Sequence, residues 1–113
     1  MPEDLTERTC VPCEGGTKPL EQEMIQKYLP QVPGWSVAHD LKSILREFEY
    51  ADFKYAMAFV NEVADLAEFE GHHPDIAIWY HKVKLTLSTH AIHGLSQNDF
   101  ILAAKINQIQ ADR

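Results

Sequence analysis

The stretch GHHPDIAIWYHKVKLTLSTH, residues 71–90, decides the fold that we expect. Apolar and other side chains alternate in two runs of this stretch: Ile76, Ile78 and Tyr80, then Val83, Leu85 and Leu87. Alternation with a period of two is typical of β-strands that bury one face. Because the runs are nearly adjacent, residues 76–80 and 82–89 are predicted to form a hairpin around His81. Pro74 keeps His73 extended in front of the first strand.

A long amphipathic helix is predicted upstream, over residues 52–70. Its apolar side chains recur at steps of three and four residues: Phe53, Ala56, Phe59, Val60, Val63, Ala64 and Ala67. This spacing places them on one face of a helix. Asp52 is a suitable N-terminal cap, and Gly71 is suited to the left-handed conformation that ends many helices.

Two further strands and two further helices are predicted. Residues 19–29 have helical spacing and end at Pro30. Strands are predicted over residues 35–38 and 41–50, and the buried face of the second carries Ile44, Arg46, Phe48 and Tyr50.

The last helix is predicted over residues 97–110, after a break at Gly94. Residues 96–99, Ser-Gln-Asn-Asp, resemble a capping box with Asp in the place of the usual Glu. The side chains that we expect this helix to bury are Phe100, Leu102, Ala103, Ile106 and Ile109.

The order of elements is therefore α-β-β-α-β-β-α, which indicates an α+β fold. We expect a four-stranded antiparallel sheet with the helices packed on one face. Such a small sheet has free edges, which a second copy of the chain could pair. Residues 1–18 are predicted to form an extended N-terminal arm, and residues 19–113 a single domain.

The composition of the chain excludes several classes of protein. Among 113 residues, 45% are hydrophobic and 24% are charged, which suits one packed domain. Ten Lys and Arg stand against 17 Asp and Glu, so direct binding to nucleic acid is not expected. No apolar run is long enough to span a bilayer and the N-terminus lacks the apolar core of a signal peptide, so we expect a cytoplasmic protein without membrane contact.

The chain has two cysteines, Cys10 and Cys13, in a C-x-x-C spacing. Such a pair can be redox-active or can supply half of a zinc site. No second cysteine pair is present and the surrounding residues have no regular pattern, so reduced thiols in an arm are the favoured interpretation.

Three of the six histidines lie at the ends of predicted elements, where small sites are commonly built. His72 and His73 follow the long helix, and His90 follows the second hairpin strand. Imidazoles exchange protons at neutral pH, so this group favours general acid–base catalysis. Glu68 precedes His72 by four residues and is expected to reach it. Asp99 lies in the first turn of the last helix.

Two plainer interpretations compete with catalysis. A single histidine is usually an ordinary surface or core residue, and we assign that role to His39, His81 and His93. Three histidines and a carboxylate could also hold zinc. Adjacent His72 and His73 project in different directions, however, so no metal site is predicted.

The sequence resembles the pterin-4a-carbinolamine dehydratase family. The resemblance covers roughly residues 8–110, and its pattern is a polar residue, His-His-Pro, an aromatic residue, a further His and an Asp. The matching residues here are Glu68, His72-His73-Pro74, Tyr80, His90 and Asp99. The arm over residues 10–16 and the Pro33-Gly34-Trp35 turn are similar to those of microbial members.

The resemblance implies a reaction and a site. The reaction is dehydration of 4a-hydroxytetrahydrobiopterin to quinonoid dihydropterin and water, without a cofactor, in the recycling of tetrahydrobiopterin. His72 and His90 are then the candidates for proton transfer, and His73 assists and binds the pterin. Further residues that the resemblance implies are Pro74, Thr89 and Ala91 in the pterin site, Glu68 to orient His72, and Asp99 either to orient His90 or to cap its helix.

The resemblance also implies partners: a second copy in a homodimer or homotetramer, and an aromatic amino-acid hydroxylase of the same pathway. Vertebrate relatives also serve as dimerisation cofactors of a transcription factor, so a non-catalytic regulatory role is the alternative function. That role requires an exposed apolar face on the helix over residues 52–69. The residues outside its core stripe are mostly polar: Lys54, Asn61, Glu62, Asp65 and Glu68.

Gly71 departs from the pattern of many relatives, which have an acidic residue before the first His. Glu70 is the residue that could replace that carboxylate.

Overall fold

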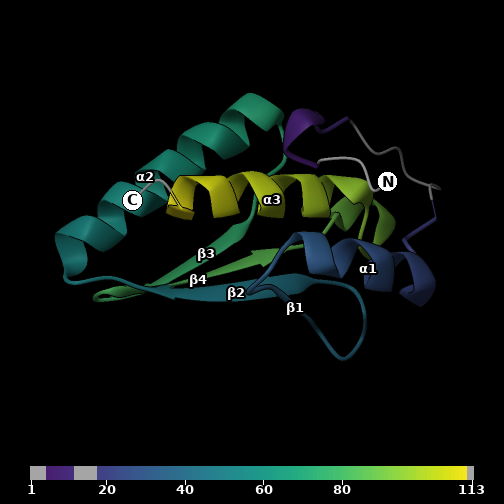
Figure 1. Ribbon diagram of the computed structural model, residues 1–113, viewed down its shortest axis with the longest axis horizontal. Coiled ribbons are helices and arrows are strands. Elements are labelled where there is room, and N and C mark those ends of the chain that lie inside the picture. Colours follow the sequence, from purple (N-terminus) through teal and green to yellow (C-terminus); the bar gives the residue numbers. More distant parts are fainter. Residues whose placement is uncertain (1–4, 12–17, 112–113) are drawn as a thin grey trace.

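The computed structural model describes residues 5–11 and 18–111. Its α-helices are α1 (Gln22–Tyr28), α2 (Phe53–Glu70) and α3 (Gln97–Ala111). Its strands are β1 (Ser36–Val37), β2 (Ile44–Glu49), β3 (Asp75–Trp79) and β4 (Lys82–Leu87), and its 3-10 helices are η1 (Leu5–Glu7), η2 (Leu29–Gln31) and η3 (His90–Ile92). The strands form one antiparallel sheet in the order β1-β2-β4-β3, and the helices lie over one face of it (Figure 1). The predicted α+β fold is confirmed.

Alternation along the strands separates the two faces of the sheet. Phe48 pairs with Val83 and Ile44 pairs with Leu87, and all four side chains are buried against the helices. Arg46 shares this face, as predicted. Its guanidinium lies over the Phe48 ring, 4.5 Å from the ring centroid, and donates a 2.6 Å hydrogen bond to Asn107 Oδ1. A charged residue is tolerated on the core face because its head group reaches a polar partner at the rim.

Helix α2 begins and ends where its caps were predicted. The Asp52 side chain accepts a hydrogen bond of 2.9 Å from the Tyr55 N–H, and Gly71 has a φ of 70° in the left-handed region. Most of the predicted stripe is buried, but Phe53 is 50% exposed and Ala64 is also exposed. The prediction for these two was wrong because the helix contacts its neighbours along a narrower stripe than the sequence pattern suggests.

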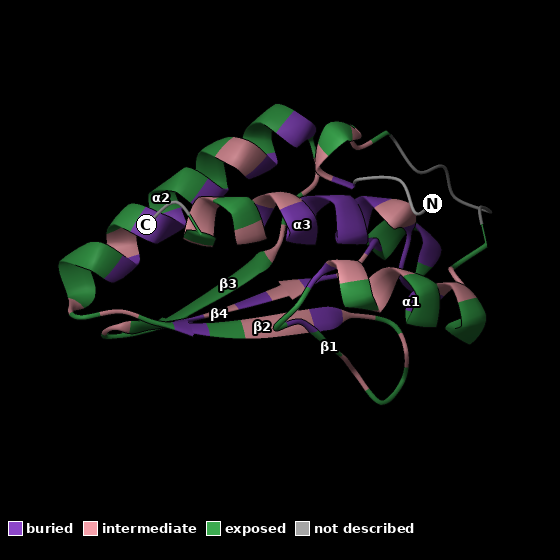
Figure 2. Ribbon diagram, in the orientation of Figure 1, coloured by how far each residue is buried: buried purple, intermediate pink, exposed green. Residues whose placement is uncertain are grey.

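Helix α3 is buried on more than one face. Four of the predicted core residues are buried, namely Phe100, Leu102, Ala103 and Ile106, whereas Ile109 is only partly buried. Ile101 and Ala104 are also buried, because α3 packs against α2 on one side and against η1 on another (Figure 2). The sequence alone does not reveal this second contact.

The loop segments differ from the predicted strands. Leu41 adopts a φ of 62° and the Lys42 N–H donates to Asp40 Oδ1, so a turn occupies the start of the predicted strand and β2 begins at Ile44. Strand β4 ends at Leu87, and Thr89 then pairs with Gly94 in an isolated antiparallel bridge. This bridge closes a small loop that contains η3.

The described part of the N-terminal arm packs on the domain. Leu5 in η1 is 2% exposed and belongs to the hydrophobic core, next to α3. Residues 1–4 and 12–17 of the predicted arm, Cys13 among them, lie outside the described residues. No helix in the described ranges has both the length and the apolar character that a membrane crossing requires.

Candidate active site

The three histidines singled out in the sequence line one pocket. His72 and His73 follow the end of α2, and His90 begins η3. The bridge between Thr89 and Gly94 folds the chain after β4 back toward the end of α2. The pocket has a volume of about 260 Å³ and is lined by Val11, Gly71, His72, His73, Ser88, Thr89, His90, Ala91 and Asn98. Residues from four separate segments of the chain therefore meet at one rim of the sheet.

His72 is held by Asp99. Its Nε2 lies 2.6 Å from Asp99 Oδ1, and its side chain is only 12% exposed while that of Asp99 is fully buried. The predicted contact between Glu68 and His72 is wrong. Helix α3 begins beside the end of α2, and its first turn brings Asp99 to His72 across 27 residues of sequence.

Glu68 contacts His73 instead. Its Oε2 is within hydrogen-bonding distance of His73 Nε2, and both side chains are mostly exposed. The helical i, i+4 relation does not hold here because Gly71 takes the left-handed conformation and ends the helix before His72. The chain turns at that point, so the carboxylate meets the next histidine.

The buried Asp99 carboxylate has three donors. Its Oδ2 accepts hydrogen bonds of 2.9 Å from the Ser96 N–H and from the Thr89 hydroxyl, and its Oδ1 faces His72. The bond to Ser96 is one half of the predicted capping box. Of the two predicted roles, Asp99 therefore caps its helix, and the histidine that it holds is His72 and not His90.

An ionised Asp99 carboxylate determines which of its partners donate. An ionised carboxylate only accepts hydrogen bonds, so His72 must donate from Nε2. In neutral His72 the other ring nitrogen, Nδ1, then carries a lone pair. The single Thr89 hydroxyl proton is given to Asp99, so in the 2.7 Å contact between Thr89 Oγ1 and Ser96 Oγ the serine is the donor.

The remaining predicted site residues are placed as follows. His90, Thr89 and Ala91 line the pocket, and His90 is exposed. Pro74 does not line it, because the chain turns away after His73 to enter β3. A second hollow of about 200 Å³ shares residues 88–90 with the first, so the two are neighbours. Its other lining residues are Lys42, His93 and Gly94.

Glu70 does not replace the missing acidic residue at position 71. Its buried carboxylate forms an ion pair of 2.5 Å with Lys105 and accepts a 2.9 Å hydrogen bond from the Cys10 N–H. Burial raises the pKa of Glu70, but the bonds from Lys105 and Cys10 outweigh burial and hold that pKa below its usual value. Burial and the nearby Glu70 charge raise the pKa of the free Cys10 thiol to about 12, which disfavours the reactive thiolate.

Three lining residues, Val11, Ser88 and Asn98, were missed by sequence reasoning, and two of them, Val11 and Asn98, contact each other. Asn98 belongs to the predicted capping motif, so its presence was already explained by the start of the helix. Val11 belongs to a stretch without periodicity, which predicts no position for it. No sequence signal connects them, because the contact spans 87 residues.

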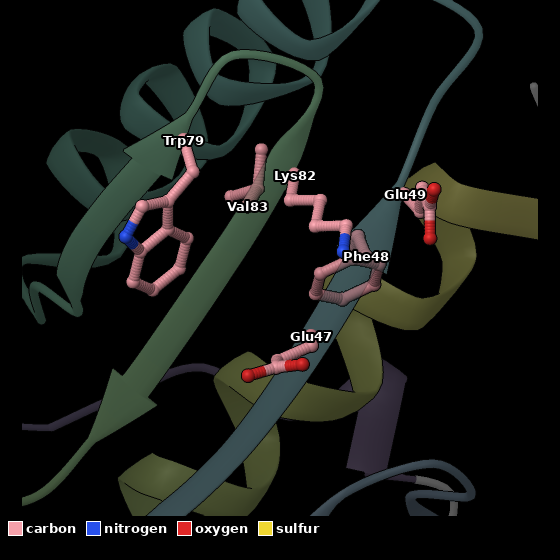
Figure 3. Close-up of a pocket in the computed structure, with 6 residues that line it drawn as sticks. All are labelled: Glu47, Phe48, Glu49, Trp79, Lys82 and Val83. Atoms are coloured by element: carbon pink, nitrogen blue, oxygen red, sulfur yellow. The ribbon is translucent and has the colours of Figure 1, made fainter.

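A larger hollow lies elsewhere, on the sheet face opposite the helices. It measures about 610 Å³ and is lined by Glu47, Phe48, Glu49, Trp79, Lys82 and Val83. Figure 3 shows Trp79, Lys82 and Glu47 projecting from the strands there, with the helices behind. It contains no histidine and is formed mainly by side chains on an open surface. We therefore place the candidate active site at the histidine pocket.

Neither His81 nor His39 joins the histidine pocket. His81 lies in the β3–β4 turn, 3.6 Å from Glu49 at the nearest charged atoms. Within residues 5–11 and 18–111, no group of three or more His, Cys, Asp or Glu is arranged to hold a metal ion.

The family model and the relatives that match this chain carry similar descriptions. Residues 18–109 match the family model described as pterin 4 alpha carbinolamine dehydratase. A protein of Halorhodospira halophila named putative pterin-4-alpha-carbinolamine dehydratase is 46% identical over 107 residues, covering 95% of this chain and 98% of its own. A protein of the same name from Alkaliphilus metalliredigens is 44% identical, covering 96% and 98% of the two chains.

Solved structures show the same fold. A transcriptional coactivator/pterin dehydratase from Brucella melitensis superposes with a TM-score of 0.77 at 32% identity, over 81% of this chain and 98% of that one. A pterin dehydratase-like protein identified as a RuBisCO assembly factor in the alpha-carboxysome has a TM-score of 0.59 at 20% identity, over 70% and 92% of the two chains, and shows likeness of fold alone. The matched range and the near full-length identity decide the assignment: the chain belongs to the pterin-4a-carbinolamine dehydratase family.

Proposed function

We propose that this protein is a 4a-hydroxytetrahydrobiopterin dehydratase, a hydro-lyase that uses histidines as its acid and base. The observation that carries the proposal is the buried Asp99, which holds His72 beside the loop that presents His90. Such a network orients one imidazole and links it to the segment that bears the other. The names of the relatives support the same activity.

The reaction needs one proton acceptor and one proton donor. The substrate is a hemiaminal, in which C4a carries a hydroxyl group and is bonded to N5–H. Loss of the N5 proton forms the C4a–N5 double bond, and the C4a–O bond breaks as its oxygen takes a proton and leaves as water. The proton count balances between two imidazoles, so the reaction proceeds without a covalent intermediate or a cofactor.

We assign the base to His72 and the acid to His90. Neutral His72 presents the lone pair of Nδ1, and the imidazolium formed when it takes the N5 proton is stabilised by the Asp99 carboxylate. His90 is exposed and exchanges protons with water, which suits the donor to the leaving hydroxyl. His73, with Glu68 as its partner, binds the pterin and assists.

The test is the rate of carbinolamine dehydration by the purified protein. We expect a rate above the spontaneous reaction, with losses in kcat of about 10²-fold for both His72→Ala and His90→Ala. His72→Ala should remove the acidic limb of the pH–rate profile, and His90→Ala the alkaline limb. A wild-type rate equal to the spontaneous one would refute the proposed function, and exchanged limbs would reverse the assignment.

The biological setting that follows is recycling of tetrahydrobiopterin in the cytoplasm, for an aromatic amino-acid hydroxylase that produces the carbinolamine. The backbone at Thr89 and Ala91 would line the pterin site. Pro74 would set the direction in which the chain leaves this site after His73.

We also propose that the protein functions as a homodimer or homotetramer. Edge strand β3 exposes Ile76 and Ile78 by 38% and 37%, together with Trp79 and Tyr80. Apolar side chains on a free sheet edge are typical of an edge that a second chain covers.

A role in binding another protein is the second candidate. Helix α2 exposes Phe53, Tyr55 and Phe69. The mostly polar residues outside its core stripe did not suggest an exposed apolar surface. A pull-down with the purified chain tests this role. A regulatory role should recover a second protein, and Phe69→Ser should abolish its binding. Self-association alone recovers only the chain itself.

A further inference from the structure

The described part of the N-terminal arm reaches the histidine pocket at Val11, which pairs with Asn98. The Val11 N–H donates a 3.0 Å hydrogen bond to Asn98 Oδ1, and Asn98 Nδ2 donates to the Val11 carbonyl. The amide of Asn98 thus satisfies both backbone groups of Val11, as a neighbouring strand would. This fixes the position and orientation of one arm residue at the mouth of the pocket.

Further contacts also hold the arm. Leu5 is buried in the core beside α3, and the Cys10 N–H donates to the Glu70 carboxylate. Glu70 lies two residues before His72, and Asn98 lies one residue before Asp99. The helix ends that carry the catalytic network therefore also hold the arm, so the arm and the histidines keep a fixed relation.

The Val11 side chain has no packing role that explains this attachment. It is 62% exposed, yet it lines the pocket together with His72, His73 and His90. An apolar side chain beside imidazoles leaves a wall against which the face of a ring can pack, and such a ring removes the isopropyl group from water. The matched family model begins only at residue 18, after these contacts.

We propose that Val11, held by Asn98, is a wall of the pterin site that positions the substrate ring against His72 and His90. The proposal rests on the proposed function, since it names the ligand that the wall contacts. Val11 touches the ring face, and Asn98 acts through Val11 as a positioning residue. Neither takes part in proton transfer.

The kinetic test compares Val11→Gly with Thr9→Gly. Both changes loosen the backbone of the arm equally, but Thr9 does not line the pocket. We expect Val11→Gly to raise KM for the carbinolamine about tenfold and to leave kcat within twofold, because the variant loses a valine side chain that the bound ring would cover. Val11→Ile should keep the wild-type KM, and so should Thr9→Gly.

A distant variant tests the arm as a unit. Leu5→Ala changes nothing in the pocket but releases the anchor of the arm, so KM should rise without a matching fall in kcat. Hydrogen exchange gives a readout independent of activity, because Asn98→Ala should remove protection from the Val11 amide in a protein whose circular dichroism is unchanged.

The outcomes separate the two proposals. A wild-type protein that does not accelerate dehydration overturns the proposed function and this inference with it. An active wild type whose KM is the same in Val11→Gly and Thr9→Gly overturns the inference alone, as does a Val11 amide that stays protected in Asn98→Ala.

Discussion

Asp99 is the residue on which the geometry of the site depends most. It is fully buried and accepts from Ser96, Thr89 and His72, so each of its oxygens has a donor. Ionic acceptors of this kind make the stronger hydrogen bonds in proteins. The residue joins the start of α3, the loop before His90 and the first histidine after α2.

Asp99→Asn tests this dependence at the scale of one atom. An amide has a single acceptor oxygen and its NH₂ group would face one of the donors, so His72 would lose its orientation. We expect kcat to fall about 10²-fold with a small change in KM, and the free energy of unfolding to fall by about 2 kcal/mol. Steady-state kinetics and urea denaturation measure the two effects, with Asp65→Asn on the exposed side of α2 as the control. A kcat within twofold of wild type would show that Asp99 only caps its helix.

At the scale of an element, the end of α2 sets the direction of both neighbouring histidines. Gly71 has a φ of 70° and its N–H donates to the Ala67 carbonyl at 2.9 Å. A Cβ at this position would meet no atom within 4 Å, so the only cost of a side chain is conformational.

Gly71→Ala should therefore destabilise the protein by about 1 kcal/mol. Asn tolerates the left-handed region better, so Gly71→Asn should cost less. Chemical denaturation of the three proteins provides the comparison. Equal stability of the Ala variant and wild type would mean that the helix ends in another conformation in solution.

The ion pair of Glu70 with Lys105 joins the ends of α2 and α3 and makes the stability of their packing depend on pH. The pKa of Glu70 in the folded protein lies below the 4.5 of an unperturbed glutamate. The folded state therefore binds the proton less readily than the unfolded state, and the stabilisation is complete above pH 4.5 and lost as the pH falls through the lowered pKa.

Glu70→Gln should destabilise the protein at pH 7 by about 2 kcal/mol, because Lys105 loses its partner. The difference between variant and wild type should then shrink as the pH falls below 4.5. Thermal unfolding between pH 3 and 7 measures this, with the exposed Glu23→Gln as the matched control. A difference that stays constant over that range would show that the ion pair does not contribute.

At the scale of the whole molecule, the sequence predicted what depends on local periodicity. The alternation in 76–87 and the caps of α2 were enough to place both elements, and the family pattern brought the histidines together. Contacts between segments that lie far apart in the chain could not be predicted from the sequence. The pairing of His72 with Asp99 depends on where α3 begins relative to α2, and the burial of Ile101 depends on η1 packing on a second side of α3.

The free edge at β3 is the feature of the whole molecule that leads to the last prediction. Ile76 and Ile78 point to the helix side of the sheet, as their register with Leu85 and Val83 requires, yet both remain partly exposed. Their pairing partners in β4 are fully buried. The helices thus cover β4 and leave the inner face of β3 incompletely covered, and a second copy paired along this edge would extend the sheet and cover both isoleucines.

Ile78→Lys should therefore shift the protein from dimer or tetramer toward monomer. A lysine at a paired edge would bring a charge into each half of a symmetric interface, whereas in the monomer its ammonium reaches water from a position that is already 37% exposed. Sedimentation velocity at several protein concentrations measures the change in mass, and Gln26→Lys on the exposed surface of α1 controls for the added charge. The folded monomer should keep its circular dichroism spectrum. A wild-type protein that sediments as a monomer, or an Ile78→Lys variant with the mass of the wild-type oligomer, would show that β3 is not the interface.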